Sequence, residues 1–267
     1  MNERIITLTT DFGIKGPFVG SMKGVILEIN PDARIIDISH EINPFDLLDA
    51  AFLVSCAYNY FPSGTVHCIV IDPGVGSERR PVVAVTEKYS FVSPDNGVLS
   101  YIFEKEQIME VIHLTESRYF LNKISQTFHG RDIFAPVSAW LTKGIDPRSM
   151  GPAIKDYVRL DLPKAKASED NKRIFGEVIH IDIFGNLLTN IPRLLFEKGF
   201  QGGKSRFKVL VGGISIERLC KAYADLQKKG MGVIMGSQGY LELFAAQDSL
   251  AKGLGIRKGE RVEVIFE

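Results

Sequence analysis

The sequence predicts two domains: an N-terminal α/β domain built on a parallel sheet, and a smaller C-terminal domain that is all-β and barrel-like. Three observations lead to this fold class. Apolar β-rich runs alternate with segments of helical periodicity in the first half of the chain. Short β-rich runs, punctuated by glycine and polar residues, fill most of the second half. Between the halves, residues 164–173 contain no large apolar side chain, which predicts a linker between domains at 1–163 and 174–267.

The first half alternates strands and helices in a regular order. β-rich runs predict strands at Ile5–Thr9, Ala33–Ser39 and Thr65–Asp72. Between them, apolar residues recur at spacings of three and four, which predicts one helix that stops at Asn30-Pro31 and another that opens at Asn43-Pro44. Right-handed crossovers of this kind place the strands side by side and parallel. Two further strands and two further helices are expected at 81–85, 89–93, 96–104 and 133–142.

The second half differs from the first in its pattern of predicted elements. Its β-rich runs predict strands within 176–191, 206–213, 232–237, 240–244 and 261–267. One segment between them, Glu217–Lys228, has the composition of a helix. The short strands and the frequent turn residues favour a compact, barrel-like sheet.

Composition restricts the class of function. The chain of 267 residues has 32 basic and 32 acidic side chains, and this neutrality disfavours a nucleic-acid partner held through its phosphates. The three cysteines lie far apart without a CxxC pair, which argues against a disulfide scaffold and predicts buried thiols at Cys56 and Cys68. The N-terminus carries charges where a signal peptide is apolar, and no apolar run reaches the length of a membrane span. We therefore expect a cytoplasmic protein that does not associate with membranes.

Three predicted strands of the first half end in polar residues. The first is followed by Asp11, the second by His40, and the third ends at Asp72. Ligands of parallel sheets bind beyond the carboxyl ends of the strands. A helix cap or a turn would explain any one of these residues. Three such ends within the first 76 residues favour a binding site.

The segment Gly74–Pro81 follows Asp72 and is rich in glycine. It lacks the Gly-Lys-Ser/Thr ending of a phosphate-binding loop and is followed by a strand, so it is not interpreted as one. Its glycines permit a sharp turn that would bring Arg79 back towards Asp72. Exposure to solvent explains Arg79 equally well at this level.

His129 stands in a Phe-His-Gly-Arg-Asp segment at the start of a predicted helix. Capping or packing is the usual role of such a histidine, and a general base or a polar cluster with Asp72 and Arg79 is the alternative. The other four histidines lie in or beside strand-like segments and are interpreted as structural. Because no HxH, HxxxH or DxD spacing occurs, a metal site at Asp11, Asp72 and His129 is disfavoured, and we expect no bound metal.

In the second half, an aspartate, an aromatic residue and an asparagine lie within five positions, at Asp182, Phe184 and Asn186. Ring stacking and a bidentate amide would suit a purine. A hairpin whose turn needs positive φ explains the same residues. The segment from Ser237 to Glu242 likewise suits either a binding loop or a plain turn into a strand.

Taken together, these segments resemble the S-adenosyl-L-methionine (SAM) hydroxide adenosyltransferases, the SAM hydrolases that form adenosine, which are relatives of the fluorinating and chlorinating adenosyl enzymes. The resemblance rests on segments in family order that span nearly the whole chain, namely 9–13, 16–26, 71–82, 94–99, 128–136, 181–191 and 237–242. It implies an N-terminal α/β domain, a C-terminal β-barrel domain and a homotrimer with sites between neighbouring subunits. The implied reaction converts SAM and water to adenosine and L-methionine, with SAM as a small-molecule substrate and no cofactor.

The resemblance also implies roles for individual residues. Asp72, Arg79 and His129 correspond to the triad that prepares the water, in which Arg79 neutralises Asp72 and favours hydroxide while His129 orients or deprotonates the water. Substrate contacts carried over from the family fall on Asp11 for the ribose hydroxyls, Phe45 and Phe128 for the walls of the pocket, Phe184 and Asn186 for adenine, and Asp182, Ser237 and Glu242 for further polar contacts.

Two residues favour hydrolysis over halogenation. Asp72 stands where the halogenating relatives carry Tyr, and Gly130 where they carry Ser. A carboxylate repels halide but accepts a hydrogen bond from water. Gly16 and Gln238 depart from charged residues of the halogenating branch, which affects the expected contacts to methionine more than the reaction.

Three other functions stay open from sequence. They are halide-dependent 5′-halogenation of SAM, a non-enzymatic sensor of SAM or adenosine, and a metal-dependent phosphohydrolase built on Asp11, Asp72, Asp132 and His129.

Overall fold

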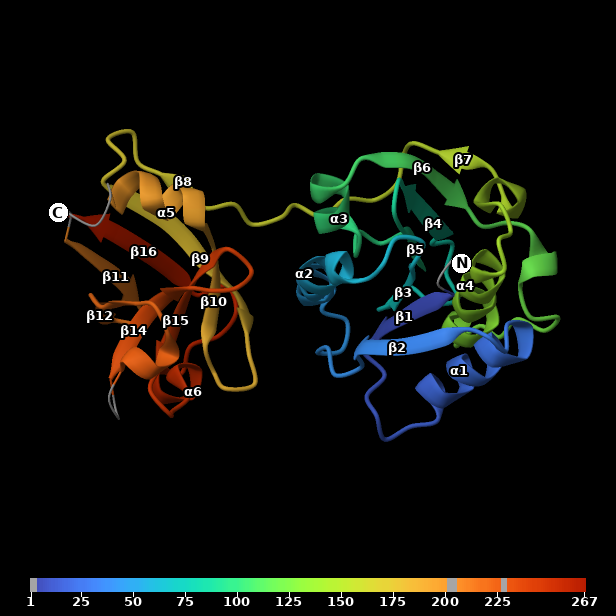
Figure 1. Ribbon diagram of the computed structural model, residues 1–267, viewed down its shortest axis with the longest axis horizontal. Coiled ribbons are helices and arrows are strands. Elements are labelled where there is room, and N and C mark those ends of the chain that lie inside the picture. Colours follow the sequence, from blue (N-terminus) through green and yellow to red (C-terminus); the bar gives the residue numbers. More distant parts are fainter. Residues whose placement is uncertain (1–3, 201–205, 227–229) are drawn as a thin grey trace. The chain divides into compact units, whose positions relative to one another are not determined.

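A computed structural model describes residues 4–200, 206–226 and 230–267 (Figure 1). The chain divides into two compact units, Met1–Leu162 and Pro163–Glu267, and each is described by itself. In the described part of the chain, none of the helices has both the length and the apolarity of a membrane span.

The first unit is built on a seven-stranded sheet in the order β2-β1-β3-β5-β4-β6-β7. Its strands are β1 (Ile5–Thr10), β2 (Arg34–Ser39), β3 (Val66–Val70), β4 (Pro81–Thr86), β5 (Ser90–Pro94), β6 (Ile108–His113) and β7 (Ala153–Ile154). The strands β2, β1, β3 and β5 run parallel as predicted. The others are antiparallel to their neighbours, so the sheet is mixed. The short turn at residues 87–89 is the cause, because so few residues between β4 and β5 permit only a hairpin.

Helices cover both faces of this sheet. α1 (Phe18–Ile29) and α4 (Ala135–Thr142) pack over one apolar core, whereas α2 (Leu47–Ala57) and α3 (Ser100–Lys105) pack over another. β3 supplies both cores in alternation, because successive side chains of a strand point to opposite faces. All four helices fall within or close to the predicted segments, and the third begins later than expected because a turn at Gly97, with φ of 90°, precedes it.

The second unit is a curled nine-stranded sheet in the order β12-β11-β16-β9-β10-β15-β14-β13, with β8 paired to β9. β9 is long: its first part pairs with β16 and its last part with β10, so the sheet wraps around one large apolar core. The strands are β8 (Lys166–Ala167), β9 (Arg173–Ile181), β10 (Leu187–Pro192), β11 (Phe207–Val211), β12 (Ile214–Ile216), β13 (Leu219–Cys220), β14 (Met231–Met235), β15 (Tyr240–Ala245) and β16 (Arg261–Phe266).

Three expectations for this unit need correction or comment. The helix predicted at Glu217–Lys228 does not form over its described residues, because Leu219–Cys220 pairs with β14 and Tyr223–Asp225 makes a 3₁₀ turn; residues 227 and 228 lie outside the described residues. Beside its curled sheet, the unit contains two short helices, α5 (Arg193–Phe200) and α6 (Leu250–Leu254). The segment 164–173, expected to be a linker, falls in this unit and includes β8.

Candidate functional site

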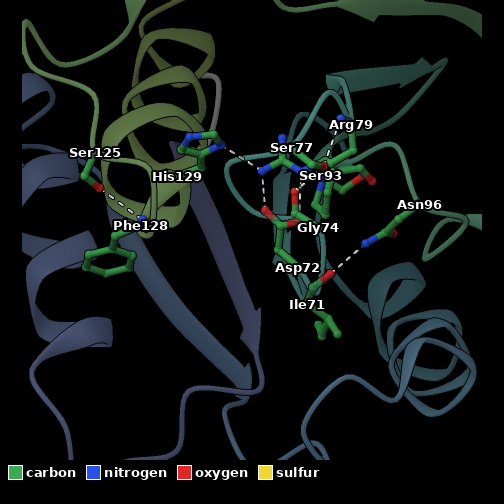
Figure 2. Close-up of polar contacts among 11 residues, drawn as sticks. Ile71, Asp72, Gly74, Ser77, Arg79, Ser93, Asn96, Ser125, Phe128 and His129 are labelled. Carbon is green, nitrogen blue, oxygen red and sulfur yellow. Dashed lines mark hydrogen bonds and ion pairs between the residues drawn. The ribbon is translucent and has the colours of Figure 1, made fainter.

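The loop after β3 turns back on itself and buries an ion pair. Figure 2 shows Arg79 folded towards Asp72, with Nε donating to Oδ1 at 2.8 Å and Nη2 donating to Oδ2. The two side chains are only 10% and 5% exposed. The turn needs glycine at position 76, where φ is 78° and a Cβ would lie 2.4 Å from the carbonyl oxygen of Gln126. The approach of Arg79 to Asp72, which sequence left open, is therefore present.

His129 joins this pair from another part of the chain. It precedes a π-helix, Gly130–Phe134, that runs into α4. Its Nδ1 lies 2.9 Å from Nη2 of Arg79 (Figure 2). Since a guanidinium only donates, Nδ1 is the acceptor and the ring proton of the neutral form resides on Nε2. Burial, followed by the positive charge of Arg79, lowers the pKa of His129 below its usual range, which favours the neutral ring.

Asp132 organises the loop next to this histidine. The carboxylate is fully buried, accepts the Ser125 N–H at 2.7 Å and lies 2.6 Å from Nε of Arg131. The Arg131 guanidinium in turn lies 5.1 Å from the centre of the Phe128 ring. Both carboxylate oxygens therefore have partners within the loop, which does not fit the metal-ligand role considered from sequence. Among the residues that the structure describes, no group of three or more His, Cys, Asp or Glu side chains is arranged to hold a metal ion.

Phe128 and Gly130 shape an aromatic wall beside the triad. The Phe128 ring packs edge-on against Phe12 and Phe18, at centroid distances of 5.7 and 5.3 Å. A Cβ at Gly130 would approach Phe128, Met22 and Phe12 at 3.2–3.3 Å, which is closer than ordinary contact. The absence of a side chain at Gly130 keeps this wall in place.

Asp11 follows β1 at the carboxyl edge of the sheet. Its Oδ2 accepts the backbone N–H of Phe45 at 3.0 Å, and the described residues donate no hydrogen bond to Oδ1. Phe45 has φ of 66°, uncommon for a residue other than glycine, and its side chain is 68% exposed. The contact thus holds Asp11 through Oδ2, while Oδ1 has no hydrogen-bond partner among the described residues and the Phe45 side chain is exposed.

The β9–β10 hairpin of the second unit is held by Asp182. Its Oδ1 accepts the backbone N–H groups of Phe184 and Asn186 at 2.9 Å, and its Oδ2 accepts Nδ2 of Asn186 at 2.9 Å. Gly185 has φ of 84°, and a Cβ there would lie 1.9 Å from Oγ of Ser249. The turn explanation therefore holds, and Asp182 orients Asn186 instead of presenting a free carboxylate.

A cavity of about 840 Å³ lies beside this hairpin. Six of its lining residues are Asp182, Phe184, Asn186, Tyr223, Phe244 and Ser249. Ser237 and Glu242, both predicted to contact substrate, are not among the described residues that line it. Glu242 is buried and accepts a hydrogen bond from the Tyr223 hydroxyl, and burial raises the pKa of its carboxyl group. Sequence reasoning missed Tyr223, because it lies in the segment misassigned as a helix.

Comparison with known proteins supports one family for both units. Residues 6–151 match the model of the SAM hydroxide adenosyltransferase N-terminal domain, and residues 176–263 match that of the C-terminal domain. The chain belongs to the SAM hydroxide adenosyltransferase family. The resemblance inferred from the motifs is thereby confirmed.

Individual relatives agree with this assignment. The (R)-S-adenosyl-L-methionine hydrolase of Methanocaldococcus jannaschii is 40% identical over 98% of this chain and 96% of its own. A crystal structure of an uncharacterized conserved protein from Thermotoga maritima is 36% identical, with a TM-score of 0.92 over 97% of this chain and 99% of that chain. A fluorinase from Actinoplanes sp. is more distant, at 27% identity over 97% of each chain.

The structure brings together some of the predicted residues within each unit. Asp72, Arg79 and His129 form one hydrogen-bonded cluster, and Asp11 with Phe45 forms a second contact in the first unit. Asp182, Phe184 and Asn186 share one hairpin in the second unit. The motifs thus correspond to three compact local arrangements.

Proposed function

We propose that this protein hydrolyses SAM to adenosine and L-methionine by attack of water or hydroxide on the ribose 5′ carbon. The observation that carries the proposal is the buried cluster of Asp72, Arg79 and His129 with a neutral imidazole. The relative from M. jannaschii, an (R)-S-adenosyl-L-methionine hydrolase, supports it.

Arg79 is the best-placed group to hold the nucleophile. Its Nε and Nη2 are used by Asp72 and His129, whereas its buried Nη1 has no hydrogen-bond partner among the described residues. A buried donor without a partner is costly, so an oxygen atom of water or hydroxide at Nη1 would satisfy it. The positive charge also favours hydroxide over water at this position.

The other two triad residues orient Arg79. Asp72 neutralises the guanidinium and fixes its plane through two parallel hydrogen bonds. His129 accepts a third from the same side chain, so its Nδ1 lone pair is not free to take a proton from the nucleophile. Of the two roles that sequence left open for His129, orienting or deprotonating the water, this arrangement therefore argues against deprotonation through Nδ1.

The reaction needs no acid for the leaving group. The oxygen lone pair forms the bond to C5′, and the electron pair of the C5′–S bond returns to sulfur, which leaves as the neutral thioether of methionine. When water is the nucleophile, its excess proton passes to solvent. The work left to the protein is to align oxygen, carbon and sulfur and to exclude competing water.

The remaining predicted residues would bind the substrate. Asp11 Oδ1 is free to accept a ribose hydroxyl, and Phe45 and Phe128 would wall the pocket. In the second unit, Asn186 keeps Oδ1 and one Nδ2 hydrogen for the amino group and ring nitrogen of adenine, with Phe184 against its face. Asp182 would act by orienting Asn186, and Glu242 by accepting the hydrogen bond of Tyr223. Ser237 is a proposed substrate contact at the β14–β15 turn.

We further propose a cytoplasmic homotrimer that needs no metal, in which the Asp11 half of each site meets the Asn186 half of a neighbour. Mixing tests this arrangement. Asp72→Asn and Asn186→Ala proteins, each impaired when assayed alone at low SAM, should show higher activity after dissociation and reassembly together, because some interfaces then contain two intact halves. If the mixture gains no activity although mixed assemblies form, the site does not span subunits.

The reaction is tested by incubating the protein with SAM in ¹⁸O-labelled water with EDTA, in the absence and presence of halide. Label in the 5′ hydroxyl of adenosine, with no halogenated nucleoside, is the expected result. Halogenated product would favour halogenation, and rescue only by added metal would favour a phosphohydrolase-like site. Binding of SAM without turnover would favour a sensor.

A further inference from the structure

His40 occupies a buried position between β2 and the loop that carries Asp11. Its side chain is about 5% exposed, and its Nδ1 lies 2.8 Å from the hydroxyl oxygen of Thr10. The backbone of the same histidine accepts the N–H of Gly13 at 2.7 Å. His40 therefore contacts the chain on both sides of Asp11, at Thr10 and at Gly13.

The Thr10 hydroxyl links His40 to the loop. Its oxygen accepts the backbone N–H of Phe12 at 3.2 Å and is also hydrogen-bonded to Nδ1 of His40. The residue before Asp11, the residue after it and His40 thus form one connected set of hydrogen bonds.

On its far side, His40 faces a charged pair. Nε2 lies 3.0 Å from Oδ1 of Asp37, at ion-pair distance but away from the line of a good hydrogen bond. Oδ2 of Asp37 is 2.6 Å from Nζ of Lys23 on α1. The pKa of Asp37 is lowered: burial acts to raise it, and the contacts with Lys23 and His40 outweigh that effect. An ionised Asp37 favours the ring orientation that presents Nδ1 to Thr10.

We propose that His40 is a positioning residue for ribose recognition, which holds the Asp11 loop in the conformation that leaves Oδ1 of Asp11 free for the ribose hydroxyls. The Asp37–Lys23 pair orients the His40 ring, and His40 contacts the Asp11 loop through the Thr10 hydroxyl. This inference rests on the proposed role of Asp11 in the hydrolase. It goes further by assigning a function to a histidine interpreted from sequence as structural.

The experiment compares two nucleosides, adenosine and 2′,3′-dideoxyadenosine, by calorimetric titration of the full-length protein. Asp11→Asn should weaken adenosine binding and have little effect on the dideoxy compound, which lacks the 2′ and 3′ hydroxyls of the ribose. His40→Ala should do the same, with a loss of about tenfold for adenosine, because one hydrogen bond that orients a charged group is at stake. His40→Asn, whose side-chain amide takes the place of Nδ1, should restore most of the affinity.

A double-mutant cycle separates positioning from simple structural damage. If His40 acts through Asp11, the loss in adenosine affinity on adding His40→Ala to Asp11→Asn should be much smaller than in the wild type. His113→Ala, which removes a histidine from β6 of the same sheet, is the control and should change neither affinity. The melting temperature of each variant shows whether the fold is intact.

The outcomes separate the inference from the proposed function. If Asp11→Asn does not discriminate between the two nucleosides, the assigned role of Asp11 is wrong and the inference falls with it. If Asp11→Asn discriminates but His40→Ala weakens both nucleosides equally or neither, only the positioning role of His40 is overturned. If the effects of the two substitutions are additive, His40 does not act through Asp11.

Discussion

Replacing Asp72 by asparagine tests whether the triad does chemistry or only holds the fold. The substitution keeps the shape of the side chain and the acceptor for Nε of Arg79. It places an amide, a donor, opposite Nη2, which is also a donor. The positive charge of Arg79, 10% exposed, is then left without its counter-ion. Both stability and activity should fall.

The magnitudes follow from burial. Removing one partner of a buried ion pair costs about 3–5 kcal/mol, and since one hydrogen bond survives here we expect about 3 kcal/mol, or a melting temperature lower by about 6–12 °C. Loss of a preorganised donor in an active site lowers kcat by about 10²–10³-fold, and we expect a loss of that order as Arg79 turns away. Because Asp72 acts to raise the pKa of His129, the substitution should lower that pKa further.

Asp95→Asn is a matched control. Asp95 is equally buried, at 5% side-chain exposure, and pairs with Arg80, the residue next to Arg79. Asp95→Asn should also lose stability, though less, because Arg80 keeps its contacts with Asp156. It should keep kcat within about twofold, because its partner lies outside the triad. The assay is chromatographic measurement of adenosine at saturating SAM, alongside calorimetric melting. If Asp72→Asn loses stability but retains the kcat of the control, the triad is structural and the proposed mechanism is wrong.

Three further predictions follow from the site. Because burial and Arg79 depress the pKa of His129, kcat should stay level as pH falls through the usual histidine pKa of about 6.5. It should decline only at lower pH, when the ring gains a proton and repels Arg79. A decline centred at or above the usual value in a pH profile of kcat would contradict a neutral, buried ring. Gly185→Ala should destabilise the protein by about 1–3 kcal/mol and weaken adenosine binding, because the new methyl group meets Ser249 at a positive φ; unchanged melting and affinity would show that the hairpin tolerates a side chain. Asn186→Ala should weaken adenosine binding by about tenfold or more in calorimetric titration. The effect on 7-deazaadenosine should be much smaller, because this nucleoside lacks the ring nitrogen that Nδ2 would contact. Equal losses for the two nucleosides would show that the assigned contact is wrong.

Much of the fold was predictable from local patterns. Helical periodicity before Asn30 and β-rich runs such as Ile5–Thr9 correspond to elements whose hydrogen bonds or apolar faces recur at short spacing. The segment Glu217–Lys228 failed because its local preference is for helix, whereas the pairing of Leu219–Cys220 with β14 is made by residues distant in sequence. The pairing of β4 with β6 is likewise made by residues distant in sequence.

The features of the site also separate into those predictable from local sequence and those that depend on the tertiary structure. By itself, the sequence determined the family and the residue types, and its glycines permitted the turn between Asp72 and Arg79 and the hairpin at Asp182. Only the tertiary structure decided that His129, fifty positions from Arg79, accepts a hydrogen bond from it, that Nη1 of Arg79 lacks a partner among the described residues, and that His40 supports the Asp11 loop. The physical reason is that burial and hydrogen-bond direction depend on which distant segments the folded core brings into contact, and these determine which proton, charge or lone pair a side chain has left for a substrate.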